Sequence, residues 1–382
     1  MKRSVPLALV ALALLFGGIA MAQDPIIIGV NLELSGRMAV TGNDTLAGIE
    51  TAHSQQSEVL GRPVELSICD NASTPEGSVA CANRFVDEGA VAVLGTYASS
   101  HSIPAANVFQ DAGVVMVSTG STNPATTQIG DYIFRIPYTD QFQGAVAAQW
   151  AFNESDGERV AIFRQQDDDY SVGLTGFFQD ALAELGGESI VLDFTSNNVD
   201  FSAQINDLRS FQPTMIYYTG FCAEAASLIP QLRQQGFDQQ ILGGDASDDL
   251  QCPEGGGAAF DGYTFTSFGE PEVLSGEAAE RANEFGELFA EQHPDAGFTG
   301  FTLAGADAYK VVMAGLENAG EVDSTALRDA LAQLDGFPGV SGEISYVGTD
   351  GTPANRIMGL YEYDVADDGT WEKVTIRGIE LE

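Results

Sequence analysis

Short, uniformly apolar runs alternate along this chain with segments whose apolar residues recur at helical spacing. In the first such segment, Leu46, Ile49 and Ala52 share one face of a helix. The alternation predicts an α/β fold in which parallel strands, covered on both faces, are joined by right-handed helical crossovers. The runs with the length and composition of buried strands are 26–34, 64–69, 91–96, 114–118, 160–164, 190–194, 215–219 and 241–244.

These strands fall into two series, which predicts two lobes. An extended segment at 132–138 separates the series, and a second crossing falls near 265–271. Helical stretches then return to the first lobe, and a third crossing leads to a hairpin-like pair near the C-terminus. We therefore expect two lobes, each a parallel sheet flanked by helices, hinged by three crossovers. The expected boundaries are 23–139 and 269–354 for the first lobe, and 140–268 and 355–382 for the second.

The first 22 residues have the three parts of a secretory signal peptide. Lys2 and Arg3 form a basic start, an apolar core follows, and Ala20-Met21-Ala22 supplies small residues for cleavage after Ala22. The core is shorter than the roughly 20 apolar residues of a bilayer span. No cysteine follows the cleavage site, so no lipid anchor is expected. The mature protein is predicted to be free in the periplasm.

Acidic residues outnumber basic ones by 55 to 16. Loss of Lys2 and Arg3 with the signal would leave 14 basic against 55 acidic residues, a net charge of −41. Such a surface repels nucleic acid and anionic lipid. We expect a monomer with no nucleic-acid partner and no direct insertion into a membrane.

The four cysteines of an exported chain favour disulfide bonds, because exported proteins face an oxidising compartment. Cys69 ends a strand and Cys81 lies in the next predicted helix, whereas Cys222 and Cys252 both follow strands of the second lobe. We expect Cys69 to pair with Cys81 and Cys222 with Cys252. Four cysteines permit three pairings, and free buried thiols are the alternative.

Two neighbouring strands of the first lobe end in runs of small hydroxylated residues. The segments 91–100 and 114–124 place Ser99 after one strand, and Ser121 and Thr122 after the next. Ligands of open parallel sheets bind outside the carboxyl ends of strands, where helix N-termini present free N–H groups to anions. The pair of segments therefore predicts a carboxylate site. The alternative is that these residues are ordinary helix caps.

With these segments in view, the chain resembles the type I periplasmic binding proteins of ABC importers, specifically the leucine/isoleucine/valine-binding family. The resemblance extends over nearly all of the mature chain. It implies a two-lobed protein that closes on a branched-chain amino acid and delivers it to a membrane permease with its ATPase. The segments that carry the resemblance are 28–36, 70–75, 95–100, 118–124, 169–173 and 217–220.

The resemblance also implies which residues bind the amino-acid backbone. In that family the ligand carboxylate is held after the third and fourth strands, at positions that correspond here to Ser99 and to Gly120, Ser121 and Thr122. The ammonium is held by an acid of the second lobe, which corresponds to Asp245. That acid is usually the longer Glu.

Three further positions face the ligand in the family. Tyr170 corresponds to a tyrosine that closes over the ligand, and Phe221 stands where a tyrosine is usual. Thr41 takes the place of a large aromatic residue beside the ligand side chain. The departures bear on the ligand side chain more than on the amino-acid backbone.

An enzyme is the main rival interpretation, and the sequence does not favour it. A hydrolase built on Ser99 or Ser121 needs a base, and none of His53, His101 and His293 lies in a pairing motif. No nucleophile elbow, phosphate loop or dinucleotide fingerprint is present, and no cofactor is expected. Asp167, Asp168 and Asp169 lack the spacing of a calcium loop, so we interpret them as a solvated charge run and expect no metal.

Two alternatives within the same fold stay open. The ligand could be an aromatic or aliphatic carboxylate or an amide. The protein could also be a sensor subunit that signals to a membrane receptor instead of an importer.

Overall fold

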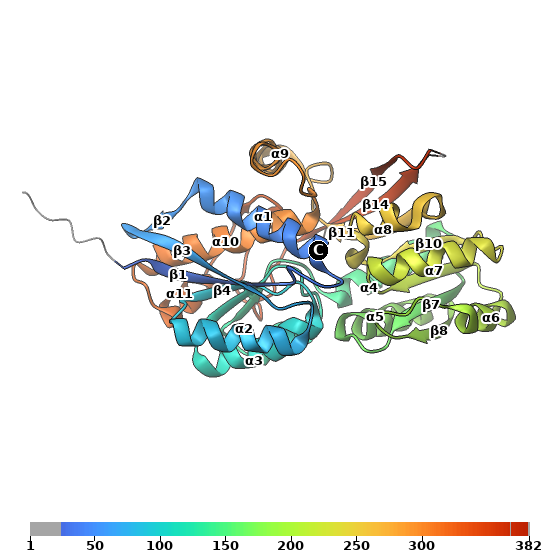
Figure 1. Cartoon of the computed structure of the whole chain (residues 1–382), viewed down its shortest axis with the longest axis horizontal. Helices are drawn as coiled ribbons and strands as arrows, with labels where there is room; N and C mark the ends of the chain where they lie inside the picture. The colour runs from blue at the N-terminus through green and yellow to red at the C-terminus, as the bar shows by residue number, and fades with distance from the viewer. Residues whose placement is uncertain (1–23, 367, 381–382) are drawn as a thin grey trace, which may run out of the picture.

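The computed structural model describes residues 24–366 and 368–380. Its two lobes lie side by side along the long axis of the molecule, each with its own sheet and helices (Figure 1). The predicted signal peptide, residues 1–22, lies outside the described residues.

The sheet of the first lobe has six strands in the order β2-β3-β1-β4-β5-β6. Neighbouring strands are parallel except for the short antiparallel pair β2 and β3. The carboxyl ends of β4 and β5 therefore meet at one edge, as the sequence predicted. The strands are β1 (Ile26–Leu32), β2 (Glu58–Val59), β3 (Arg62–Asp70), β4 (Ala92–Gly95), β5 (Val115–Ser118) and β6 (Ile133–Arg135).

Helices cover both faces of this sheet. The α1 and α10 helices pack together on one side and α2 and α3 on the other (Figure 1). These helices and the smaller elements of the lobe are α1 (Ala39–Gln55), α2 (Pro75–Glu88), α3 (Ser99–Ala112), η1 (Pro124–Ile129), α9 (Gly276–Gln292), α10 (Gly300–Ala319), α11 (Ser324–Leu331), β12 (Phe337–Gly339) and β13 (Gly342–Ile344).

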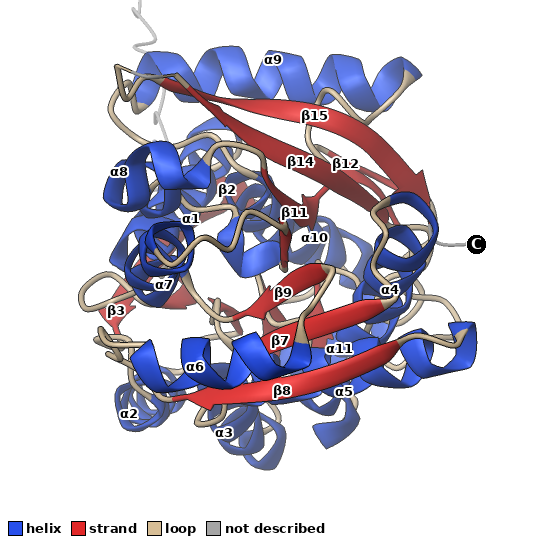
Figure 2. Cartoon of the chain, turned by 90° about the vertical axis from the view of Figure 1, so that its right-hand side faces the viewer, coloured by secondary structure: helices blue, strands red, loops and turns tan. Residues whose placement is uncertain are grey.

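The sheet of the second lobe has seven strands in the order β15-β14-β11-β10-β9-β7-β8. The five neighbouring strands β11, β10, β9, β7 and β8 are parallel, and β14 and β15 extend the sheet in the antiparallel sense (Figure 2). The predicted C-terminal hairpin is thus confirmed, and its short connection explains the antiparallel direction. The strands are β7 (Arg159–Gln165), β8 (Glu188–Phe194), β9 (Met215–Thr219), β10 (Gln240–Gly243), β11 (Tyr263–Phe268), β14 (Ile357–Val365) and β15 (Trp371–Glu380).

The helices of the second lobe pack in pairs, α4 against α5 and α7 against α8. Asp245 belongs to a short 3-10 turn directly after β10, at the carboxyl edge of the sheet. The helical elements are α4 (Asp140–Glu154), α5 (Asp169–Leu185), α6 (Ser202–Phe211), α7 (Cys222–Gln234), η2 (Asp245–Ser247), α8 (Gln251–Gly256) and η3 (Gly257–Phe260).

The chain passes between the lobes three times. It leaves the first sheet after β6, returns from β11 to α9 and α10, and crosses again between β13 and β14. The lobe boundaries at residues 139, 268 and 354 stay a prediction.

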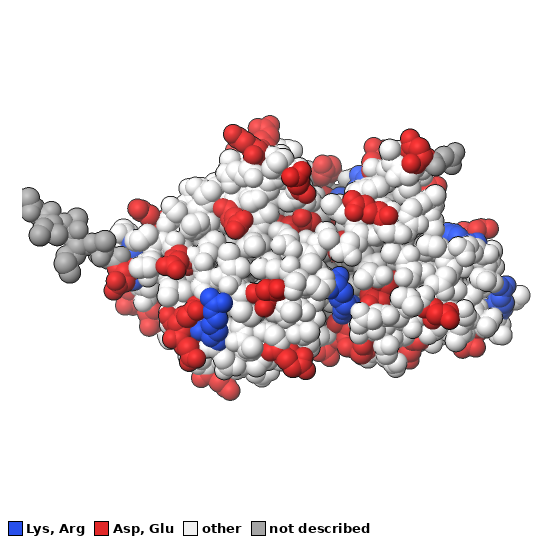
Figure 3. All heavy atoms as spheres, in the orientation of Figure 1, with Lys and Arg blue, Asp and Glu red and all other residues white. Residues whose placement is uncertain are grey.

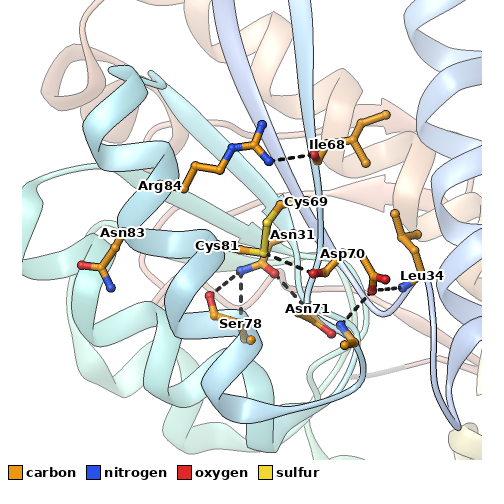
Figure 4. The surroundings of a disulfide bond; sticks show 12 residues. Asn31, Leu34, Ile68, Cys69, Asp70, Asn71, Ser78, Cys81, Asn83 and Arg84 are labelled. Carbon is orange, nitrogen blue, oxygen red and sulfur yellow. Dashed lines mark hydrogen bonds between the residues drawn. A yellow bond between two sulfur atoms is a disulfide. The ribbon is translucent and has the colours of Figure 1, made fainter.

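Two disulfide bonds join the four cysteines in the predicted pairs, Cys69 with Cys81 and Cys222 with Cys252. The first links the end of β3 to α2 (Figure 4). Beside it, Nδ2 of Asn31 donates to the carbonyl oxygen of Ser78 at 3.1 Å. The carboxyl ends of β1 and β3 are therefore fixed to the helix that follows β3.

Acidic side chains are scattered over the visible face of both lobes, with few basic ones among them (Figure 3). Among the residues that the structure describes, no helix combines the length and the apolar character needed to cross a bilayer.

Candidate ligand-binding site

A small cavity of about 10 Å³, room for about one water molecule, lies between the lobes. It is far smaller than the 300–1,000 Å³ of typical pockets for drug-sized ligands, so the two lobes lie nearly in contact around it. Five of the predicted site residues line it, and Tyr97 and the residues next to Ser99 and Asp245 complete its wall. The lining residues are Tyr97, Ala98, Ser99 and Gly120 from the first lobe, and Tyr170, Phe221, Asp245 and Ala246 from the second.

Ser99 is the first residue of α3 and does not cap it, because the N-cap position is Ala98. The helix-cap alternative is therefore wrong for Ser99. Its hydroxyl oxygen accepts hydrogen bonds from Oγ of Ser121 at 3.1 Å and from the backbone N–H of Asn123 at 3.3 Å. Oγ of Ser121 lies 2.6 Å from Oγ1 of Thr126, which then serves as its donor.

The three hydroxyl groups form a relay of hydrogen bonds in which Thr126 donates to Ser121 and Ser121 donates to Ser99. Because Ser99 accepts both bonds, its own proton is left to donate, and Ser99 lines the cavity. The first N–H groups of α3, which have no partner within the helix, start at the same residue. This wall can bind an anion.

Ser121 and Thr122 are buried behind the cavity wall and do not line it. Oγ1 of Thr122 has no hydrogen-bond partner among the described residues. Asp140, whose backbone N–H donates to the carbonyl oxygen of Thr122 at 2.9 Å, is also buried, and both its carboxylate oxygens lack a partner within the described part of the chain. Burial, and then the charge of Asp245, raise the pKa of Asp140 well above its usual range.

Gly120 is required by packing inside the first lobe. A Cβ at this position would lie 2.6 Å from a ring carbon of Tyr97 and 3.1 Å from the ring of Phe301. Any larger residue would displace Tyr97, which lines the cavity.

Three aromatic rings form the apolar part of the wall. The ring centroid of Phe221 lies 6.0 Å from that of Tyr97 and 5.8 Å from that of Tyr170. Tyr97 belongs to one of the segments that carry the family resemblance, but sequence reasoning did not assign it to the site. Its position two residues before Ser99, after a buried strand, is the signal that could have identified it.

Asp245 forms the polar part of the wall on the second lobe. Nε2 of Gln143 donates to its carboxylate at 2.6 Å, which sequence reasoning missed because Gln143 lies in a distant helix. Burial raises the pKa of Asp245 to about 7, although the hydroxyl of Tyr170 acts in the opposite direction. A carboxyl group in this state favours a cationic partner, since only a nearby positive charge restores its ionised form at low cost.

Gly243 and Gly244 precede Asp245 and leave room for protein side chains. A Cβ on Gly244 would lie 2.1 Å from the hydroxyl oxygen of Tyr170, and one on Gly243 would lie 2.2 Å from that of Tyr263. The structure thus explains both glycines by the packing of tyrosines.

Direct hydrogen bonds hold the two lobes together around the cavity. Oγ1 of Thr41 donates to Asp249 at 2.7 Å, so the structure places Thr41 in a contact between lobes and not in the cavity wall. Oγ of Ser100 donates to Asp168 at 2.6 Å. Asp168 is 3% exposed and caps α5 through the N–H of Ser171, so its interpretation as part of a solvated charge run is wrong.

His101, the histidine nearest in sequence to Ser99, is engaged elsewhere. Its Nδ1 lies 2.6 Å from the buried carboxylate of Glu33, which also accepts hydrogen bonds from the backbone N–H groups of Tyr97 and Ala98. Within the described residues Ser99 has no histidine partner. Glu33 and His101 therefore support the loop that leads into Ser99.

A family model described as periplasmic binding protein matches residues 25–370. The chain belongs to the periplasmic binding protein family. Members of this family bind solutes and are not enzymes, so this periplasmic binding protein is a solute-binding protein. The resemblance recognised from the sequence is confirmed.

Relatives match this periplasmic binding protein over nearly its whole length. The Leu/Ile/Val-binding protein homolog 1 of Brucella suis is 28% identical over 371 residues, which cover 95% of this chain and 96% of the relative. The crystal structure of the leucine-binding protein LivK from Thermotoga maritima has 33% identity and a TM-score of 0.86, covering 92% of this chain and 99% of LivK. LivJ from Streptococcus pneumoniae, solved in complex with isoleucine, has a TM-score of 0.83 at 22% identity and covers 94% of this chain and 100% of LivJ, which shows the shared fold.

Proposed function

We propose that this protein binds an α-amino acid in the cavity between its lobes and delivers it to the permease of an ABC importer. The observation that carries the proposal is the polarity of the cavity. A hydroxyl donor and a helix N-terminus lie on the first-lobe wall at Ser99, and the buried carboxyl group of Asp245 lies on the second-lobe wall. These groups match the carboxylate and the ammonium of an amino acid.

In this arrangement the ligand connects the lobes. Its carboxylate binds Ser99 in the first lobe, and its ammonium binds Asp245 in the second. Neither lobe carries both partners, so the zwitterion is fully bound only when the lobes close on it. Tyr170 and Phe221 then cover it from the second lobe.

A branched-chain amino acid is the ligand class we propose. The rings of Tyr97, Tyr170 and Phe221 line the cavity and favour an aliphatic side chain over a charged one. Leu/Ile/Val-binding homologs and the leucine-binding LivK among its relatives support this choice.

We further propose that the protein is exported, with removal of residues 1–22, and acts in the periplasm as a monomer. Binding the ligand by lobe closure would let the permease recognise the loaded form. A sensor role would use the same closed form.

Ligand binding tests the proposal directly. Thermal shifts and calorimetry with leucine, valine, alanine and phenylalanine, and with the analogues that lack the amino group, should show preference for the amino acids. Asp245→Asn keeps the shape but removes the charge, so it should weaken amino-acid binding by about 2–5 kcal/mol and affect the des-amino analogues much less.

Asp193→Asn is the control, because it removes one acid that is partly exposed and paired with Arg164 outside the cavity. It should leave affinity unchanged. Preference of the wild type for des-amino acids, or undiminished binding of amino acids by Asp245→Asn, would make an aliphatic or aromatic carboxylate the ligand instead.

A further inference from the structure

Arg37 reaches from the first lobe to three residues of the second. It lies in the loop between β1 and α1, and its Nη1 is 3.4 Å from Oε1 of Gln165 and 3.5 Å from Oε2 of Glu224. Its guanidinium carbon lies 4.7 Å from the ring centroid of Phe221. A planar guanidinium can stack on a ring and donate hydrogen bonds at the same time, which a lysine ammonium does less well.

The partners of Arg37 connect it to the ligand cavity. Phe221 lines that cavity and directly precedes α7, and Glu224 lies in the first turn of the same helix. One cation therefore contacts both an aromatic residue of the wall and the helix that carries it. Tyr97 also meets Phe221 ring to ring across the cleft, whereas Thr41 and Asp249, which form a hydrogen bond between the lobes, do not line the cavity.

The contact between Arg37 and Glu224 is largely buried between the lobes. The side chain of Glu224 is 2% exposed, and that of Arg37 is 17% exposed. One carboxylate oxygen of Glu224 accepts from the backbone N–H of Asn197 at 2.7 Å, and the other faces Arg37. Removal of Arg37 while the lobes stay together would leave this buried carboxylate oxygen without its cation, which is costly.

The net charge of the chain is a second reason why a cation between the lobes favours closure. Both lobes belong to a chain with 55 acidic and 16 basic residues, so their surfaces repel each other as they approach. An ion pair placed across the cleft offsets part of that repulsion.

We propose that Arg37 is a positioning residue that stabilises the closed form, keeps Phe221 against the bound ligand and slows ligand release. The identity of the ligand rests on the proposed function, but the closing role of Arg37 does not.

Arg84 offers a matched control for the test. It also pairs with a glutamate, Glu88 at 2.7 Å, and also lies over a phenylalanine, Phe85 at 5.7 Å, but all three residues belong to α2 of the first lobe. Figure 4 shows Arg84 on this helix, beside the disulfide. Arg37→Gln and Arg84→Gln thus remove the same charge and the same kinds of contact, and only the first crosses the cleft.

Stopped-flow measurement with the best amino acid of the panel gives the association and dissociation rates of each variant. Arg37→Gln should raise the dissociation rate at least ten-fold and change the association rate less than three-fold. Arg37→Lys should fall between wild type and Arg37→Gln, and Arg84→Gln should stay within two-fold of wild type. Melting temperatures of the unliganded variants identify any loss of folding.

A dissociation rate of Arg37→Gln within two-fold of that of Arg84→Gln would overturn the proposal. If no amino acid binds the wild type, the proposed function fails, and the closing role is decided by small-angle scattering of the unliganded proteins. Arg37→Gln should then have a larger radius of gyration than wild type and Arg84→Gln. Equal radii would overturn the closing role.

Discussion

Gln143 binds Asp245 at two points. Its Nε2 donates to the carboxylate at 2.6 Å, and its Oε1 accepts from the backbone N–H of Asp245 at 3.1 Å. Oε1 also accepts from the hydroxyl of Thr266 at 2.9 Å, which fixes the orientation of the amide. The acid of the cavity wall is therefore held in place by the second lobe before any ligand arrives.

The pH dependence of binding should reveal the state of Asp245. Burial raises its pKa to about 7, so below pH 7 the unliganded carboxyl group is mostly neutral. An ammonium needs the ionised form. Affinity for an amino acid should therefore rise about ten-fold per pH unit up to pH 7 and level off above it. Calorimetry between pH 5.5 and 8.5 measures this slope.

Asp245→Asn should abolish that slope. Asp44 is the control, because burial also raises its pKa to about 7 while its carboxylate binds the N–H of Gly297 away from the cavity wall. Asp44→Asn should keep the slope. A slope that persists in Asp245→Asn would show that another group controls binding.

Removal of the Ser99 hydroxyl, the last in the relay from Thr126 through Ser121, should weaken amino-acid binding. Ser99→Ala takes away the donor that lines the cavity, so amino-acid affinity should fall by about 1–3 kcal/mol. Thr122→Ala should have a smaller effect, since Thr122 lies behind the wall. Calorimetry on both variants decides the order, and equal affinity of Ser99→Ala and wild type would exclude a carboxylate bond at Ser99.

A methyl group at Gly120 should disturb the wall of the cavity. Gly120→Ala would place Cβ 2.6 Å from the ring of Tyr97, so Tyr97 must shift, and we expect the unliganded protein to lose about 1–3 kcal/mol of stability. The affinity for the ligand should also fall, because Tyr97 lines the cavity. Gly176→Ala in α5 is the control, because its Cβ would meet no atom within 4 Å, and it should be neutral or stabilising. Denaturant titration and calorimetry measure both effects; Gly120→Ala with wild-type behaviour would contradict the packing argument.

The two disulfides should differ in their effect on ligand binding. Each should stabilise the fold by about 2–4 kcal/mol, the Cys222–Cys252 bond more, since it spans 30 residues against 12 for Cys69–Cys81. Because Cys222 follows Phe221 directly, its replacement together with Cys252 by serine should also lower ligand affinity. The Cys69/Cys81 double serine variant is the comparison. A loss of ligand affinity in the Cys69/Cys81 variant alone would contradict this prediction.

Sequence reasoning was accurate where the signal is local. The apolar runs predicted β1, β4, β5, β7, β9 and β10, which are buried on both faces, and also the partly exposed β3 and β8. The segments interpreted as crossings, 132–138 and 265–271, overlap β6 and β11. The small polar residues after β4 and β5 do come together, since the carboxyl ends of parallel strands share an edge, but only Ser99 lines the cavity, and Ser121 and Thr122 lie behind its wall. It was wrong for Asp168, whose acidic neighbours suggested exposure, because helix capping and Ser100 of the other lobe bury this carboxylate.

The sequence by itself determined the α/β alternation and the two lobes, because apolar patterning is a property of neighbouring residues. It favoured the observed disulfide pairs among three possible pairings and indicated Ser99 at a strand end, whereas Gly120, Tyr170, Phe221 and Asp245 came from the resemblance to the family. Only the tertiary structure decided that Gln143 holds Asp245, 102 residues away, and that Arg37 meets Glu224, 187 residues away. A polar side chain can pair with many partners, and its partner depends on how the three crossovers bring the lobes together.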